Sequence, residues 1–302
     1  MSERIEIAGR GFELTHPDKV LFPAAGITKR DLVDYYARIA RVALPHWQGR
    51  PVSMQRFPEG IDGEGFFQKN APDYFPDWIA RAELAKEGGT VSHVVADHPA
   101  TMAYLAAQGC ITAHLGLSRV DRVSRPDRLI LDLDPSGDDF APVRETAGRL
   151  KALLDRLEAP AFVQTTGSRG VHVVVPLDRG AGFDEARELA RALAGRIAAE
   201  APTLATVEQR KDKRGGRVFL DYLRNACGQT VVAPYAVRAR RRAPVATPLD
   251  WAEALGSTGP QSYTLGNIFR RLGQKPDPWR DIGGQAIAVA TLAGRLEKLK
   301  KS

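Results

Sequence analysis

Hydrophobic and polar positions along this chain follow two periods, one typical of helices and one typical of strands. Apolar residues at helical spacing predict helices at about 28–44, 99–108, 139–157, 183–200 and 286–300. Short apolar or alternating runs predict strands, or a hairpin in the first case, at 3–14, 51–57, 91–95, 129–134, 161–165, 171–176, 217–222 and 230–233. Strands and helices do not alternate regularly, so the pattern indicates an α+β fold, or two sheets with covering helices.

Two helix starts carry capping signals. Thr28 is followed three residues later by Asp31, which is typical of an N-cap and a helix-start acid. Asp138 or Asp139 is expected to cap the helix that contains Leu150, Leu153, Leu154 and Leu157. Exposed N–H groups and the helix dipole at the Thr28 junction would favour an anion.

Composition narrows the class of protein. The chain has 302 residues, of which 43% are hydrophobic and 26% charged, as is ordinary for a soluble globular protein with a core that needs no disulfides. Cys110 and Cys227 are far apart, which fits a reduced intracellular setting. The charged N-terminus indicates no signal peptide, and no apolar run approaches the ~20 residues of a membrane helix. We therefore expect a cytoplasmic protein without a membrane partner.

The net charge of +7 favours a polyanionic partner such as nucleic acid, because lysines and arginines neutralise phosphates.

Three aspartates are candidate metal ligands. Asp132 and Asp134 lie two apart on a predicted strand, so both side chains point to one face. Asp221 ends another predicted strand. Carboxylates suit Mg²⁺ or Mn²⁺, and three acids on neighbouring strands could hold two ions for a displacement at phosphorus. The alternatives are a simple helix cap or the D-x-D motif of a metal-dependent glycosyltransferase.

A strand–turn–strand at 165–172 could bind phosphate. Its glycines allow N–H groups to converge, while Ser168, Arg169 and His172 add donors. His172 alternates with valines and is expected to point away from the apolar face. A plain hairpin with a polar tip is the alternative.

Arginines downstream of the third acid are candidate triphosphate ligands, namely Arg224 and Arg238. The basic run continues through Arg240, Arg241 and Arg242, which we expect to contact a nucleic-acid backbone or only water.

Basic and aromatic residues also gather in the N-terminal third. Lys19 and Lys29 flank the first predicted loop-to-helix junction, and Phe66 and Phe67 precede Lys69. Aromatic residues beside lysine suit base stacking with a phosphate clamp. The alternative for the two phenylalanines is that at least one fills the core.

The motifs together resemble the polymerase domain of bacterial DNA ligase D, in the archaeo-eukaryotic primase superfamily. They are H-P-D-K-V-L-F-P, G-I-T-K, F-F-Q-K-N-A-P, P-D-R-L-I-L-D-L-D-P, T-G-S-R-G-V-H and F-L-D-Y-L-R-N, in family order from 16 to 225. The resemblance extends over about 15–279. It implies one primase-polymerase catalytic domain over 1–302, with a DNA-end-binding part at 1–118 and a catalytic part at 119–302. Its fold would consist of mixed and antiparallel sheets flanked by helices.

The resemblance also implies an activity. Such enzymes extend 3′-hydroxyl ends and fill gaps in non-homologous end joining, usually prefer ribonucleotides, and use two Mn²⁺ or Mg²⁺ ions. Implied partners are DNA ends with a 5′-phosphate, NTPs or dNTPs, a DNA ligase and a Ku-type end-binding protein, at the nucleoid. A non-catalytic DNA-end-binding module remains an alternative.

The matching positions carry family roles. Asp132, Asp134 and Asp221 would be the metal ligands, and the incoming nucleotide would contact His114, Ser168, Arg169, His172, Arg224 and Arg238. DNA would contact His16, Lys19, Lys29, Phe66, Phe67 and Lys69. The family often has Asn at position 16 and Lys at position 169, so His16 and Arg169 are departures. No ligase-like lysine motif or phosphoesterase segment is found, as expected of a stand-alone polymerase or of one domain of a longer protein.

Overall fold

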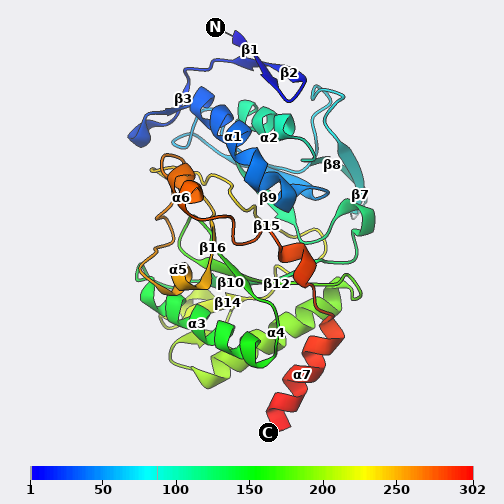
Figure 1. The fold of residues 1–302 in the computed structure, drawn as a ribbon, viewed down its shortest axis with the longest axis vertical. Helices are drawn as coiled ribbons and strands as arrows, with labels where there is room; N and C mark the ends of the chain where they lie inside the picture. Colours follow the sequence, from blue (N-terminus) through cyan, green and yellow to red (C-terminus); the bar gives the residue numbers. More distant parts are fainter. Residues whose placement is uncertain (1, 87, 302) are drawn as a thin grey trace. The chain divides into compact units, whose positions relative to one another are not determined.

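The computed structural model describes residues 2–86 and 88–301, which form two compact units (Figure 1). Unit 1 comprises Met1–Asp121, Thr230–Ala246 and Tyr263–Lys275. Unit 2 comprises Arg122–Gln229, Thr247–Ser262 and Pro276–Ser302. Each unit therefore combines segments that are distant in sequence.

Unit 1 is built on a sheet in the order β15-β9-β5-β8-β7, and β6 pairs with the same edge of β5 as β8 does. Hairpins β1–β2 and β3–β4 are separate from it. The elements are β1 (Ser2–Ile7), β2 (Arg10–Thr15), β3 (Val20–Phe22), β4 (Ile27–Thr28), α1 (Lys29–Trp47), β5 (Pro51–Arg56), β6 (Phe66–Gln68), β7 (Arg81–Lys86), β8 (Gly89–Val95), α2 (Pro99–Ala107), β9 (Cys110–Gly116), β15 (Thr230–Val232) and α6 (Ile268–Gln274).

Polar groups of α1 bind the segment that follows β15, which belongs to unit 1 although it lies far along the chain. The Trp47 indole N–H donates to the Pro234 carbonyl at 2.8 Å, and the Tyr35 hydroxyl donates to the Tyr235 carbonyl at 2.7 Å. Both donors are buried in the apolar core. A buried donor without a partner is costly, so these two bonds fix the path of the chain after β15.

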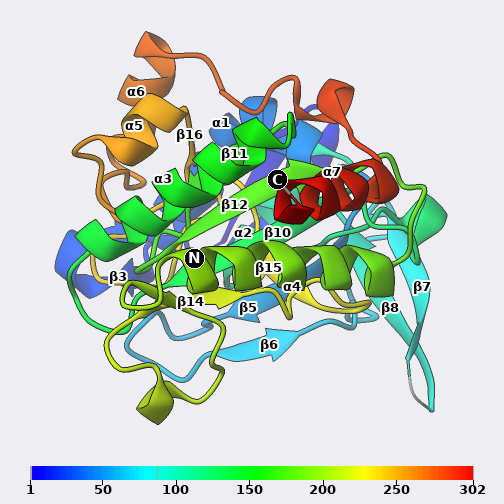
Figure 2. The ribbon, with the colours of Figure 1, turned by 90° about the horizontal axis from the view of Figure 1, so that it is seen from below.

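Unit 2 contains a six-stranded sheet in the order β13-β14-β10-β12-β11-β16, antiparallel except for the parallel pair β13–β14. Helices α3 and α4 lie side by side against this sheet, and α7 lies beside α4 (Figure 2). The elements are β10 (Arg128–Asp134), α3 (Ala141–Arg156), β11 (Phe162–Thr165), β12 (Val171–Pro176), α4 (Phe183–Glu200), β13 (Ala205–Thr206), β14 (Val218–Asp221), β16 (Pro248–Leu249), α5 (Trp251–Leu255) and α7 (Val289–Lys301).

Strand β10 is central in the unit 2 sheet and explains why the acids lie where they do. Leu129, Leu131 and Leu133 are fully buried on one face, and strand alternation places Asp132 and Asp134 on the other. The apolar half of the strand anchors it in the core. The two carboxylates are thereby held on a rigid element.

Most predicted elements are present. The 3–14 segment is a hairpin, as the pattern allowed, whereas the last helix begins at Val289 rather than near residue 286. The N-cap of α3 is Phe140, not Asp138 or Asp139, although Asp139 Oδ1 accepts from the Ala141 N–H at 2.9 Å. The predicted strands did not include β9, which pairs with both β5 and β15.

Within the part of the chain that the structure describes, no helix is both long and apolar enough to cross a membrane.

Candidate active site

Three of the predicted site residues form one row across the unit 2 sheet. Asp132 on β10 is in register with His172 on β12 and with Asp221 on β14. Asp134, two residues further along β10, is in register with Phe219. The structure therefore brings the three carboxylates and the histidine together on adjacent strands.

The carboxylates repel one another in a partly buried setting. The pKa of Asp134 is raised from 3.8 to about 6, first by burial and then by the negative charge of Asp132. Burial, with a smaller contribution from Asp132, also raises the pKa of Asp221. A site that disfavours its own negative charge gains from a bound cation.

The donor set fits a hard divalent cation, since three carboxylates converge on neighbouring strands. Burial and the charge of Asp132 raise the pKa values of Asp134 and Asp221, and a bound cation would offset both effects. As their side chains stand, residues 2–86 and 88–301 contain no group of three or more His, Cys, Asp or Glu that could hold a metal ion.

The raised pKa predicts a pH-dependent stability difference for Asp134→Asn. The ionised carboxylate is less favourable in the folded protein than in the unfolded chain. This penalty is complete above about pH 6 and absent below about pH 4, where both states are protonated. With a chelator at pH 8, Asp134→Asn is expected to raise the free energy of unfolding by on the order of 2 kcal/mol.

Denaturant unfolding at pH 8 and at pH 4 checks this, and the gain should vanish at the lower pH. A gain that is equal at both values would mean that the carboxylate charge is not the cause.

His172 is held by its neighbours on both sides. Its Nδ1 lies 3.1 Å from Gln164 Nε2, and its Nε2 lies 3.6 Å from Asp132 Oδ1. With the amide nitrogen donating to Nδ1, the ring proton is on Nε2, toward the acids. As expected, His172 points away from the face that carries Val171 and Val173, because it is in register with Asp132 and not with the buried leucines of β10. The residue is nevertheless only 2% exposed, since both faces of β12 are covered.

The turn between β11 and β12 is organised by one hydroxyl. Thr166 Oγ1 accepts from the N–H groups of Ser168 and Gly170, both at 3.3 Å. These two N–H groups converge on a protein oxygen, so phosphate binding here would depend mainly on side chains. Ser168 is half-buried and Arg169 is exposed, so Arg169 is the freer to reach an anion.

The segment after β14 is clamped to β10. Asn225 donates through Nδ2 to the Ile130 carbonyl at 2.7 Å and accepts from the Ile130 N–H at 2.9 Å. Arg224 Nε lies 3.4 Å from Asp221 Oδ2. The hydrogen bonds of Asn225 thereby hold the Arg224 guanidinium next to the Asp221 carboxylate.

Arg214 was missed in the sequence. It is buried, its guanidinium lies 4.0 Å from the centre of the Phe219 ring, and it donates to the carbonyls of Glu208 and Gln209. Its charge lowers the pKa values of Asp134 and Asp221, although burial outweighs this effect. The run K-D-K-R-G-G resembles a solvated loop, so nothing in the sequence separates this arginine from its neighbours.

In unit 1, Lys19 and Lys29 approach each other. The pKa of Lys29 is lowered by burial and then by the positive charges of Lys19 and Arg56. Lys19 Nζ forms an ion pair with Glu59 at 2.7 Å, and Lys29 Nζ donates to the Thr15 carbonyl at 2.7 Å. Repelling cations at one place form a natural site for an anion.

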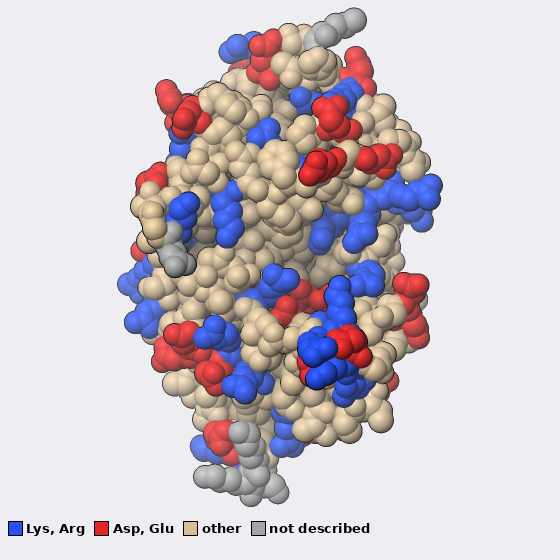
Figure 3. All heavy atoms as spheres, turned by 180° about the vertical axis from the view of Figure 1, so that it is seen from behind, with Lys and Arg blue, Asp and Glu red and all other residues tan. Residues whose placement is uncertain are grey.

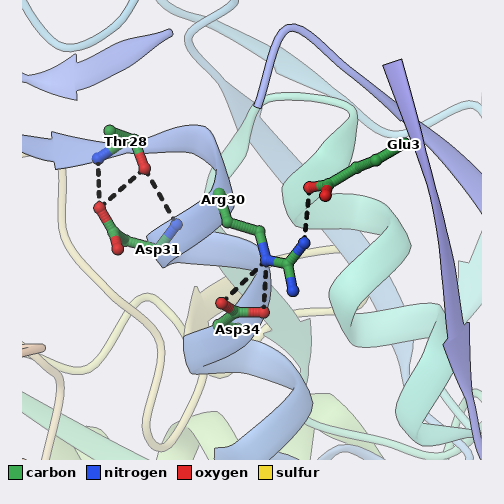
Figure 4. A network of polar contacts seen from close by, with 5 residues as sticks. All are labelled: Glu3, Thr28, Arg30, Asp31 and Asp34. Atoms are coloured by element: carbon green, nitrogen blue, oxygen red, sulfur yellow. Dashed lines mark hydrogen bonds and ion pairs between the residues drawn. The ribbon is translucent and has the colours of Figure 1, made fainter. Parts of the chain in front are cut away.

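The start of α1 fixes Lys29 at the first helical position. Thr28 and Asp31 form a capping box, and Arg30 joins Asp34 to Glu3 of β1 (Figure 4). The predicted cap is thus confirmed.

The expectation of exposed N–H groups at this helix start was wrong. The N–H groups of Lys29 and Arg30 donate to the carbonyls of Lys19 and Pro17, and that of Asp31 donates to Thr28. The loop before the helix supplies these acceptors, so an anion here would be held by lysine side chains.

His16 lies at the start of the same loop, with φ of 51°. Asn, Asp and His are the residues, apart from glycine, most enriched in this left-handed region. The departure from Asn at position 16 therefore preserves the turn.

Phe66 and Phe67 are both exposed, by 45% and 61%, so the alternative that one of them fills the core is wrong. Among the strands that the structure describes, β6 pairs with β5 alone, and its short length leaves both rings uncovered. Phe67 lies 5.2 Å from the His114 ring, and Arg56, missed in the sequence, lies 5.7 Å from the Phe66 ring. In unit 1 the two phenylalanines therefore lie near His114 and Arg56. Arg56 in turn is close enough to Lys29 for its charge to lower the pKa of that lysine.

The other lysines and arginines that were predicted to contact nucleotide or DNA are also in unit 1. Lys69 follows β6 and is exposed. Arg238 follows Val237, whose carbonyl accepts from Thr112 of β9 at 2.8 Å, on the same strand as His114. Arg240, Arg241 and Arg242 are exposed. Lysines and arginines form several separate groups on the face shown in Figure 3, so net charge alone does not locate a DNA surface.

Comparison with known proteins supports the resemblance seen in the motifs. The model of the family described as LigD, primase-polymerase domain, matches residues 28–279. The multifunctional non-homologous end joining DNA repair protein LigD of Mycobacterium tuberculosis is 37% identical over 299 residues, which cover 95% of this chain and 38% of that protein. The bifunctional non-homologous end joining protein LigD of Bacillus subtilis is 31% identical over 272 residues, 89% of this chain and 44% of that protein.

A solved structure gives the same result for the fold. The polymerase domain from Mycobacterium tuberculosis ligase D in complex with DNA has a TM-score of 0.84 and 33% identity, covering 91% of this chain and 98% of that chain. The predicted α+β class is confirmed. The chain spans about two fifths of the length of the M. tuberculosis relative, that is, its polymerase portion.

Proposed function

Because this chain belongs to the LigD primase-polymerase domain family, we propose that it adds nucleotides to 3′-hydroxyl ends of DNA and fills gaps during non-homologous end joining. Membership of this family makes the chain a nucleotidyltransferase-type enzyme. The observation that carries the specific proposal is the row Asp132–His172–Asp221, with Asp134 beside it. A DNA-binding module would have no use for three mutually repelling carboxylates in its sheet.

Different residues of unit 2 would bind the metal ions and the triphosphate during nucleotide addition. Asp132, Asp134 and Asp221 would hold two Mn²⁺ or Mg²⁺ ions, which when bound supply charge stabilisation for the attacking and leaving oxygens. The 3′-hydroxyl oxygen gives up its proton to solvent and bonds to the α-phosphorus of the NTP or dNTP. The bond from that phosphorus to the oxygen bridging the α- and β-phosphates breaks, and pyrophosphate leaves with the electron pair. Arg224 provides positive charge for the triphosphate, and the His172 Nε2–H faces the acids as a donor.

The other predicted residues would position the substrates. Ser168, Arg169 and Arg238 would contact the triphosphate, and His114 the nucleotide sugar. Phe66 and Phe67 would stack on DNA bases, Lys69 would support the template, and Lys19 and Lys29, with His16, would bind the 5′-phosphate. We propose that a DNA ligase and a Ku-type end-binding protein act with this chain at the nucleoid, in the cytoplasm.

Primer extension with pyrophosphate detection tests the proposal. On a recessed DNA duplex with NTP and Mn²⁺, each added nucleotide should release one pyrophosphate. A glycosyltransferase would instead release a nucleoside phosphate from a sugar nucleotide. A binding module would retain the duplex and release nothing.

The paired lysines give a separate prediction. The double variant Lys19→Ala/Lys29→Ala should lose the preference for gapped DNA with a 5′-phosphate over DNA with a 5′-hydroxyl. The phosphate monoester carries more charge than an internal diester, so the wild-type preference should be about tenfold at low salt and shrink as salt increases. Titration of both DNAs by fluorescence anisotropy measures it.

Two control variants sharpen this test. Glu59→Gln removes the partner of Lys19 and should increase the preference. Lys151→Ala/Lys298→Ala removes the same charge from unit 2 helices and should leave it unchanged. Equal wild-type affinity for the two DNAs would show that the lysines are ordinary surface residues.

A further inference from the structure

Unit 2 has a groove between α4 and α7 that contains none of the site residues described above. The two helices lie side by side in Figure 2. The groove has a volume of about 470 Å³. Its lining comes from both helices and from the segments that precede them.

The floor of the groove is apolar and made of small side chains. Leu189 and Leu296 are buried beneath it, while Ala192 and Ala293 are half-buried, one on each helix. Alanines leave the space between the helices unfilled. Large apolar side chains from another molecule could therefore enter and be removed from water.

The rim of the groove is acidic. Asp178, Glu185, Glu188 and Glu297 are exposed, and the described lining residues include no lysine or arginine. This local excess of negative charge occurs in a chain whose net charge is +7. It repels DNA and nucleotides, so the groove does not serve the substrates of the proposed polymerase.

We propose that this groove binds a basic amphipathic helix of a partner protein. Such a helix presents apolar residues at i, i+3 or i+4, and i+7 to the small-residue floor. Lysines or arginines on its flanks then meet the four rim carboxylates, which steer association and fix orientation. The site is separate from the proposed catalytic residues and is independent of their function.

A defined peptide tests the proposal on the full chain. The probe is a fluorescent helical peptide of about 15 residues with leucines at this spacing and lysines on both flanks. Anisotropy should show micromolar binding that weakens with salt. The variant Glu188→Lys/Glu297→Lys should weaken it at least about tenfold, and Ala293→Trp, which fills the floor, should weaken it as well.

Controls separate docking from general charge attraction. Glu6→Lys/Glu13→Lys makes the same charge change on the β1–β2 hairpin and should leave peptide binding unchanged, as should addition of duplex DNA. All variants should keep the wild-type melting temperature and extension activity. The proposal is overturned if the peptide does not bind, if both charge-reversal variants bind it equally well, or if DNA displaces it.

Discussion

Replacement of Asp134 or Asp132 by Ala is expected to reduce nucleotide addition by on the order of 10³-fold, because a metal ion supplies several kcal/mol of charge stabilisation and each 1.4 kcal/mol is about tenfold in rate. Both carboxylates project from the central strand of the unit 2 sheet, next to Asp221. Single-turnover extension of a gapped DNA with Mn²⁺ and then with Mg²⁺ measures the loss.

The matched control is Asp138→Ala, which removes the same charge from an exposed position four residues beyond Asp134. It should extend DNA at the wild-type rate. DNA binding by Asp134→Ala should be largely retained, because the proposed end-binding residues lie in unit 1. Near-normal extension by Asp134→Ala with both metals would mean that the carboxylates are not the metal ligands.

Gly170→Ala is expected to damage stability and activity together. A Cβ at this position would clash with the Leu133 carbonyl oxygen and would lie 3.6 Å from the Asp134 Cα. Both neighbours are backbone atoms of β10, so the turn or the strand must move. Overpacking of this kind lowers the free energy of unfolding by about 3 kcal/mol, and a shift of about 1 Å at the acids can reduce the rate about 10²-fold.

Gly137→Ala provides the comparison, since a Cβ there meets nothing within 4 Å. It should match the wild type in thermal unfolding and in extension. If Gly170→Ala also matches the wild type in both measurements, the contact between the turn and β10 is looser than the structure has it.

The features that could be predicted from sequence are those that local pattern determines. The apolar run that ends in Asp132 and Asp134 predicts strand β10 and places both acids at the end of that strand. Thr28 with Asp31 predicts the start of α1. The order of the sequence motifs then indicated the LigD polymerase family. Each of these signals lies within a few residues of the feature that it predicts.

What could not be predicted depends on contacts between distant segments. Cys110–Gly116 is interrupted by Thr112 and His114, whose partners come from residues far along the chain, so β9 was missed. The N–H groups at the start of α1 are occupied by carbonyls of the preceding loop. Adjacent phenylalanines on a strand suggest one buried ring, but β6 is too short and too peripheral to cover either.

The most direct test of the central claim is a crystal structure with gapped DNA, a nucleotide and Mn²⁺, in which anomalous scattering locates the ions. We expect two Mn²⁺ peaks at the triphosphate, each at about 2.0–2.2 Å from oxygens of Asp132, Asp134 or Asp221. Manganese bound at the triphosphate without these carboxylates, or a nucleotide bound away from β10 and β14, would contradict the account.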